Sequence, residues 1–136
     1  MKFDDVRGAM GMASLVVRPG DTSVAQAHND LPVVDPTVLT NLMEGACSAA
    51  LAEHFASGET SVTQELVLAI SGTVGVGAEI RAHATCVDID GPILDFNVEV
   101  HHGSRLIASA NLTRKVVDRV SYMARIAAES VMSEAG

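Results

Sequence analysis

One long apolar segment, residues 35–58, constrains the fold of this chain more than any other part of the sequence. Asp35 can accept hydrogen bonds from the first free N–H groups of a helix, and Pro36 fits the first helical position because it has no N–H to leave unpaired. Gly58 can adopt the left-handed conformation that ends a helix. The segment therefore predicts one long helix, with apolar residues around most of its circumference, as is typical of a helix surrounded by other structure.

A narrow polar stripe runs along this apolar helix. At about 100° per residue, Glu44 lies on the same side as Thr37, Asn41 and Ser48. Burying an ionised carboxylate is costly unless it is paired, hydrogen-bonded or protonated. Glu44 is therefore a candidate functional residue, although a carboxylate that reaches solvent or meets an arginine would explain the stripe equally well.

The rest of the sequence predicts an antiparallel sheet and a second helix. Alternation of apolar and polar residues, with turn signals between the segments, predicts strands at 14–18, 60–71, 78–88, 94–101 and 106–117. Residues 24–27 are a further extended candidate, and residues 1–12 are predicted to be an irregular lead-in. Apolar residues at three- and four-residue steps predict an amphipathic helix at 118–133. The sheet should be able to curl tightly around the long helix because both are rich in small residues.

Bulk properties exclude several classes of function. A chain of 136 residues predicts one domain, 1–136, and its net charge of −8 argues against a nucleic-acid surface. Cys47 and Cys86 fall in apolar segments without metal-ligand spacing, so reduced core cysteines and no metal site are expected. No apolar run approaches the ~20 residues that span a bilayer, and no basic leader is present, which predicts a cytoplasmic protein that does not bind membranes.

Four short motifs carry a resemblance to a known family. They are DLPV at 30–33, LMEGAC at 42–47, GE at 58–59 and the Gly77 that opens a strand. In this order and spacing, residues 30–114 resemble the fluoroacetyl-CoA thioesterase-like branch of the hot-dog thioesterases. The resemblance implies an α+β hot-dog fold, a curved antiparallel sheet wrapped around one long central helix, here with an added C-terminal helix.

The resemblance also implies a site. Proteins of this branch hydrolyse acyl-CoA thioesters at a homodimer interface, with a Thr at the helix start, a Glu within the helix and a His on the following strand. Glu44 matches the Glu, whereas Pro36 occupies the Thr position and leaves Thr37 as a displaced candidate. The His position falls on Ile70, which should share an inward face with neighbouring leucines. Arg114 coincides with an Arg late in the last strand of the family.

These matches predict a thioesterase-like hydrolase of a small or medium acyl-CoA, with Glu44 as general base or nucleophile and Thr37 as a second catalytic candidate. The substrate-binding candidates are Asn41, His28, Asp30 and Arg114. A homodimer is expected, with a tetramer as the alternative, and no cofactor is expected beyond the coenzyme A of the substrate. Free N–H groups at the helix start would stabilise the thioester oxyanion.

Other functions remain open at the level of sequence. The absence of a His at position 70 favours a non-catalytic hot-dog dimer that binds an acyl-CoA or a related ligand. Enoyl-CoA hydratase chemistry fits less well, since the sequence shows no paired Asp and His at the helix entrance with the spacing of those enzymes. A loop His such as His28 is more often a capping or surface residue, and Cys47 is more often a core residue than a nucleophile.

Overall fold

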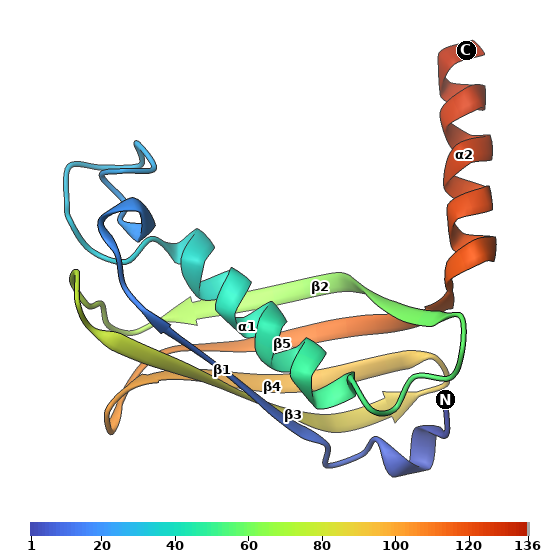
Figure 1. Ribbon diagram of the computed structural model, residues 1–136, viewed down its shortest axis with the longest axis horizontal. Helices are drawn as coiled ribbons and strands as arrows, with labels where there is room; N and C mark the ends of the chain where they lie inside the picture. Colours follow the sequence, from blue (N-terminus) through green and yellow to red (C-terminus); the bar gives the residue numbers. More distant parts are fainter. Residues whose placement is uncertain (136) are drawn as a thin grey trace.

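The alternating segments form one antiparallel sheet in the computed structural model, which describes residues 1–135. The strand order is β1-β3-β4-β5-β2, with β1 Met10–Val16, β2 Glu59–Ile70, β3 Glu79–Asp90, β4 Ile93–His102 and β5 Arg105–Asp118. Helix α1 (Pro36–Leu51) crosses one face of the curled sheet, and helix α2 (Arg119–Ala135) follows β5 (Figure 1). The predicted architecture, a curved antiparallel sheet around one long helix with an added C-terminal helix, is confirmed.

Helix α1 begins as its sequence predicts and ends earlier. The Asp35 side chain accepts the Thr37 N–H at 3.1 Å, and Pro36 occupies the first helical position. The helix stops at Leu51, and turns occupy the residues before β2. In these turns the Glu59 carboxylate accepts a hydrogen bond from the Ala56 N–H at 2.8 Å. The carboxylate thus takes the place of the backbone carbonyl to which this N–H would bond in a longer helix.

Only one side of α1 is buried, so the prediction of a helix surrounded by other structure is wrong for the single chain. The buried side packs on the sheet and consists of Leu39, Leu42, Met43, Ala46, Cys47, Ala50 and Leu51. On the opposite side Asn41, Gly45 and Ser48 are exposed. The polar stripe therefore lies along the open side of the helix, where a ligand or a second chain can reach it.

The core fills the space between α1 and the inner face of the sheet. Much of its sheet side is formed by alternate residues of β3 and β4, and β5 adds further buried side chains: Ile80, Ala82, Ala84, Cys86, Leu94, Phe96, Val98, Val100, Ile107, Ala108 and Leu112. Strand β1 also lies directly against the helix, because a Cβ at Gly11 would overlap the Ala46 carbonyl oxygen and the Ala50 backbone nitrogen. Small residues thus allow the close approach that was expected of this sheet and helix.

The segment before α1 differs from its prediction in two places. Strand β1 begins at Met10, inside the expected irregular lead-in, because it pairs with β3 from Met10–Thr85 to Val16–Glu79. Residues 24–27 form turns rather than a strand, since the Gln26 N–H bonds back to the Thr22 carbonyl. The loop from 22 to 35 is fixed by two isolated bridges, Thr22–Val34 and Val33–Gly75.

A β-bulge divides strand β2 into two parts. The pairing of β2 with β5 shifts register between Thr63 and Glu65. An extra residue in one strand reverses the alternation of its side chains. As a result, Ser61 and Thr63 contact groups on the α1 side of the sheet before the bulge, and Leu66 and Leu68 pack against the core after it.

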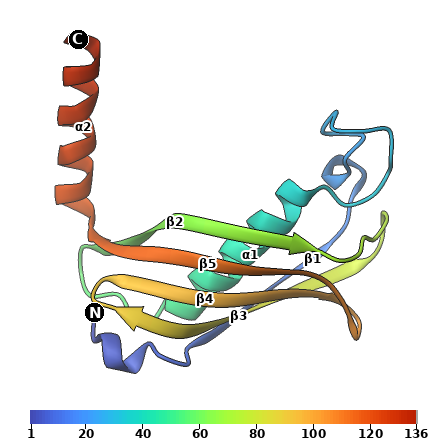
Figure 2. The ribbon, with the colours of Figure 1, turned by 180° about the vertical axis from the view of Figure 1, so that it is seen from behind.

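Helix α2 projects away from the domain. It confirms the predicted C-terminal helix, and none of its residues is buried. Both ribbon views show it leaving the end of β5 and extending past β2, beyond the edge of the sheet (Figures 1 and 2). Across residues 1–135, no helix has the length and apolar character that a membrane span requires.

Candidate active site

The first polar cluster surrounds Glu44 at the middle of α1. Arg114 of β5 reaches it from the sheet, and its Nη2 lies 3.2 Å from Glu44 Oε1 and 3.1 Å from the Glu44 carbonyl oxygen. Nη1 of the same guanidinium donates to the hydroxyls of Ser48 and Ser61 at 3.1 and 3.2 Å. Glu44 therefore meets an arginine, which is one of the explanations that the sequence left open for its polar stripe.

A hydroxyl on the other side completes the support of this carboxylate. Thr63 Oγ1 lies 2.7 and 2.8 Å from the two carboxylate oxygens of Glu44. The Arg114 side chain is 9% exposed and that of Glu44 is 37% exposed. The carboxylate is thus oriented by a nearly buried cation and still accessible to water or substrate, which is what a general base or a nucleophile requires.

Thr63 is a site residue that the sequence did not reveal. Counting back from Leu66 and Leu68 with strict strand alternation places Thr63 on the outer face of the sheet. The bulge after Thr63 turns it inward instead. A polar residue beside a β-bulge is the signal that would identify a site residue such as Thr63. This sequence does not indicate where a bulge lies.

The second polar cluster lies at the start of α1. Asp35 is fully buried, and its carboxylate accepts bonds from Ser23 Oγ at 2.9 Å and from the N–H and hydroxyl of Thr37. His28 Nδ1 lies 2.7 Å from Asp35 Oδ1. The hydrogen bond from the Thr37 hydroxyl, with others from His28 and Ser23, holds the pKa of Asp35 well below its usual range although burial opposes the shift. Asp35 therefore stays ionised and can orient the His28 ring.

The sequence did not reveal this pair. His28 and Asp35 are seven positions apart and meet because the loop folds back on itself. The conformation of this loop is fixed by backbone hydrogen bonds from the His28 N–H to the Ser23 carbonyl and from the Ser23 N–H to the Val33 carbonyl. The His28 side chain is about half exposed, so its Nε2 can be reached from solvent.

A small cavity of about 180 Å³ opens beside the same helix start. Its lining includes Pro36 and Ile70, the positions where the resemblance implies a Thr and a His, together with Leu39 and Gly72. The fold therefore brings these two positions together, although both carry apolar side chains. Ile70 points toward the helix start, as its predicted inward face requires.

Ile70 is, however, remote from Glu44 of the same chain. It follows Thr63, the strand contact of Glu44, by seven residues on β2, which is about 23 Å along an extended strand. Glu44 follows Pro36 by two helical turns, or about 12 Å. The inward face that was predicted for Ile70 therefore does not bring a side chain at position 70 to Glu44 of the same chain.

The remaining candidate site residues do not lie together in one cluster. Thr37 binds Asp35 rather than Glu44, and its N–H is occupied by the Asp35 cap, so it is not a free oxyanion donor at the helix start. Asn41 is exposed on α1, and Asp30 is exposed in the preceding loop. Their roles in substrate binding stay predictions.

Two further kinds of site can be assessed from the described residues. Cys47 is buried, and burial raises the pKa of its thiol to about 12, so it cannot supply a thiolate near neutral pH. Within residues 1–135, no group of three or more His, Cys, Asp or Glu side chains is arranged to hold a metal ion.

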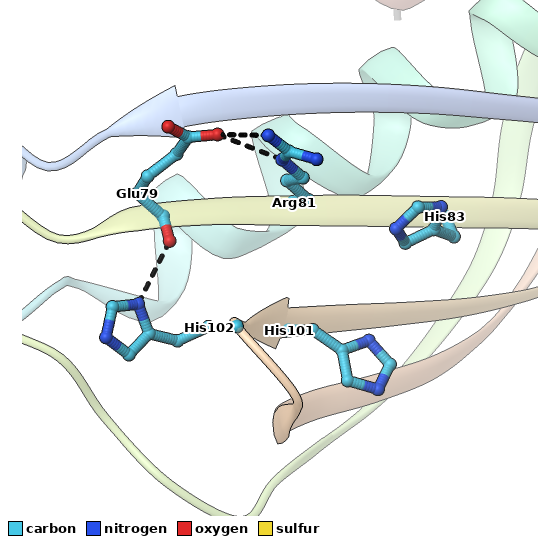
Figure 3. Close-up of a pocket in the computed structure, with 6 residues that line it drawn as sticks. Glu79, Arg81, His83, His101 and His102 are labelled. Carbon is cyan, nitrogen blue, oxygen red and sulfur yellow. Dashed lines mark hydrogen bonds and ion pairs between the residues drawn. The ribbon is translucent and has the colours of Figure 1, made fainter.

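A hollow of about 490 Å³ lies on the outer face of the sheet (Figure 3). Arg81 is paired with Glu79 at 2.8 Å, and His102 Nδ1 lies 3.0 Å from the Glu79 carbonyl oxygen. The rings of His83 and His101 have centroids 6.3 Å apart. Arg81, His83 and His101 lie on the polar face that the strand alternation predicts, opposite α1, and the hollow is therefore separate from Glu44.

Comparison with known proteins agrees with this architecture. The fluoroacetyl-CoA thioesterase FlK has a TM-score of 0.79 and 23% identity, over 88% of this chain and 93% of that chain. A thioesterase superfamily protein from Thermus thermophilus has a TM-score of 0.88 and 17% identity, over 96% of each chain. A hot-dog-like protein from Thermanaerovibrio acidaminovorans has a TM-score of 0.87 and 16% identity, over 95% of this chain and 97% of that chain.

These likenesses establish the hot-dog fold. A search of curated proteins found no match. The model of one family, described as fluoroacetyl-CoA-specific thioesterase (FlK), matches residues 17–120, which include both polar clusters. This chain belongs to the FlK family of hot-dog thioesterases.

Proposed function

We propose that this protein is a thioester hydrolase that acts on a small or medium acyl-CoA at the interface of a homodimer. The observation that carries the proposal is the Glu44 carboxylate, which is fixed by Arg114 and Thr63 and remains accessible. A carboxylate without a chemical role would be easier to replace by an apolar residue than to support with an almost buried arginine. The family membership supports the same reaction class.

In the proposed reaction, a water molecule attacks the thioester carbonyl while the Glu44 carboxylate takes the proton of that water. Collapse of the tetrahedral intermediate breaks the C–S bond and releases a carboxylic acid and the thiol of coenzyme A. Direct attack by Glu44 would instead give a mixed anhydride that water then hydrolyses. A single turnover in ¹⁸O-labelled water tests the two routes. Label in Glu44 identifies direct attack followed by attack of water on the Glu44 carbonyl of the anhydride, whereas attack of water on the thioester puts the label in the released acid.

The leaving thiolate needs a proton, and His28 is the group that we propose for this step. A buried, ionised Asp35 holds its ring through Nδ1, which is how a carboxylate orients a general acid–base His. Within one chain this pair lies near Pro36, about two turns from Glu44. The proton would therefore have to come from a second copy.

A twofold dimer would bring the two clusters together. The outer edge of β2 has no partner strand among residues 1–135. If two copies of β2 pair antiparallel, the end of one strand that carries Ile70 lies beside the first half of the other, where Thr63 contacts Glu44. We therefore place each site between Glu44 of one copy and the His28–Asp35 pair of its partner.

One observation favours a second function. The cavity at the helix start is lined by Pro36 and Ile70, where the resemblance implies a hydroxyl and an imidazole. A protein that has lost both groups could bind an acyl-CoA without hydrolysing it. The Glu44 cluster argues for hydrolysis, and the apolar cavity argues for binding alone.

Release of thiol from a panel of acyl-CoA thioesters tests the two functions. The panel should include fluoroacetyl-CoA, which the names of the relatives give as their substrate. Glu44→Gln should lower turnover by about 10²–10⁴-fold, the usual contribution of a positioned proton acceptor. Glu53→Gln, which changes an exposed carboxylate near the end of the same helix, should leave turnover unchanged.

His28→Asn should lower turnover while binding is kept. If the unmodified protein binds acyl-CoA but releases no thiol from any member of the panel, and Glu44→Gln binds equally well, the protein is a binding dimer and the hydrolase proposal fails.

A further inference from the structure

Helix α2 carries an apolar face that its own chain does not cover. Val120, Met123, Ala127 and Val131 recur at three- and four-residue steps, so they share one side of the helix. All four are exposed, and Met123 and Val131 have exposed fractions of 58% and 66%. A helix with such a stripe is normally packed against other structure, because burial of apolar surface provides most of its stability.

The position of α2 indicates what covers this face. The helix extends past β2, in the direction in which further strands would be added to the sheet (Figures 1 and 2). Edge strand β2 has 12 residues, and its outer edge is unpaired among residues 1–135. A second copy that pairs with this edge would occupy the space alongside α2.

Twofold symmetry identifies the surface that α2 would meet. The helix begins close to the first residue of β2, as the bond from Arg119 N–H to the Gly58 carbonyl at 2.8 Å shows. In an antiparallel pair of β2 strands, this end faces the last residue of β2 in the partner. That end carries exposed apolar side chains around the helix start, namely Leu31, Ile70 and Val76.

The dimensions favour a second copy as the occupant. Pairing of β2 alone would bury a strip roughly 40 Å long and 10 Å high on each copy, about 800 Å² in total, which is the size of a typical crystal contact. A 17-residue helix is about 25 Å long, the width of roughly five strands. Two such helices, each covering the other copy, would raise the total to roughly 1,800 Å², within the range of stable dimers.

We infer that α2 is an interface arm, which packs its Val120–Val131 face on the partner's loops beside the helix start. Helix α2 of each copy would then form one wall of the entrance to a site that contains residues of both copies. The inference rests on the β2-paired dimer of the proposed function, but it does not depend on hydrolysis.

Cross-linking between two different variants tests the contact directly. The two native cysteines are buried, so an introduced surface cysteine is the reactive thiol. Met123→Cys and Val76→Cys chains, co-expressed with different tags and treated with a short bismaleimide, should give a mixed cross-linked dimer. The matched control pairs Met123→Cys with Val16→Cys, an exposed position on β1 at the opposite edge of the sheet, and should give none.

A second measurement tests the energetic role of the arm. Met123→Glu combined with Val131→Glu should raise the dimer dissociation constant in sedimentation at least 100-fold, while Glu134→Gln at the exposed end of α2 should leave it unchanged. Circular dichroism of the double variant should show that the domain stays folded, since none of these residues is in the core.

The outcomes separate the arm from the proposed function. A cross-link equal for Val76→Cys and Val16→Cys, or a dimer unaffected by the two glutamates, would overturn the arm even if Glu44 is catalytic. A protein without thioesterase activity that still gives the specific cross-link would refute hydrolysis and support the arm.

Discussion

Replacement of Glu44 by Gln separates the structural role of this carboxylate from its chemical role. The amide has the shape of the carboxylate but removes the negative charge that faces Arg114 at 3.2 Å. Breaking a fully buried ion pair costs about 3–5 kcal/mol. Here the Glu44 side chain is 37% exposed and Arg114 keeps its bonds to two serine hydroxyls, so solvent screening lowers the expected loss to about 1–2 kcal/mol.

A double-mutant cycle with Arg114→Leu measures this contribution. In the Arg114→Leu background, Glu44→Gln should cost almost nothing because the guanidinium is gone, which gives a coupling energy of about 1–2 kcal/mol. The single Glu44→Gln change should lower the Tm by roughly 3–8 °C for a chain of this size. Urea unfolding at one fixed protein concentration is the suitable assay, since the stability of a dimer depends on concentration.

Turnover of the same variants completes the experiment. If Glu44 is the base, Glu44→Gln loses about 10²–10⁴-fold in turnover, far more than its modest destabilisation explains. A coupling energy below about 0.5 kcal/mol would show that the ion pair with Arg114 does not stabilise the fold appreciably. A coupling of the expected size with unchanged turnover would show that Glu44 is a structural residue only.

Three further predictions test other parts of the molecule. Gly11→Ala should destabilise the fold by about 1–3 kcal/mol in urea unfolding because β1 must move away from α1, whereas Gly20→Ala, where a Cβ has open space, should change it by less than about 0.5 kcal/mol. The lowered pKa of Asp35 means that its contribution to stability is present above the unfolded value near 4 and is lost as the pH falls below it. Asp35→Asn should therefore flatten the acid limb of a plot of urea midpoint against pH, and an unchanged limb would exclude Asp35 as the group responsible. Ile70→His should raise turnover relative to Ile70→Asn if the partner's helix start lies beside Glu44, and equal rates would argue against that site geometry.

Local chemistry accounts for what the sequence predicted correctly. A capping Asp followed by Pro defines the start of α1, and the contact of Glu44 with Arg114 satisfies the rule that a carboxylate in an apolar helix needs a partner. The contacts that were missed depend on a β-bulge and a loop closure, which the periodicity of the sequence does not indicate. Thr63 faces Glu44 because of a bulge, and His28 meets Asp35 because a loop closes on itself. The open side of α1 was missed because the periodicity of apolar and small residues is the same in two cases. Such residues can be buried within one chain, or they can lie at a contact with another copy.

The two edges of the sheet are unequal, and this difference determines which aggregates the fold can form. Strand β1 has seven residues and β2 has 12 with a bulge, so the two edges do not match in length or twist. Joining β1 of one copy to β2 of the next would be a head-to-tail contact, which produces a fibre unless the copies close into a ring. The poor match disfavours that polymer, and so does the β2–β2 pairing of the proposed dimer, which occupies one of the two edges. A change that breaks the β2–β2 pairing would expose that edge, and fibre growth would then become a hazard during purification.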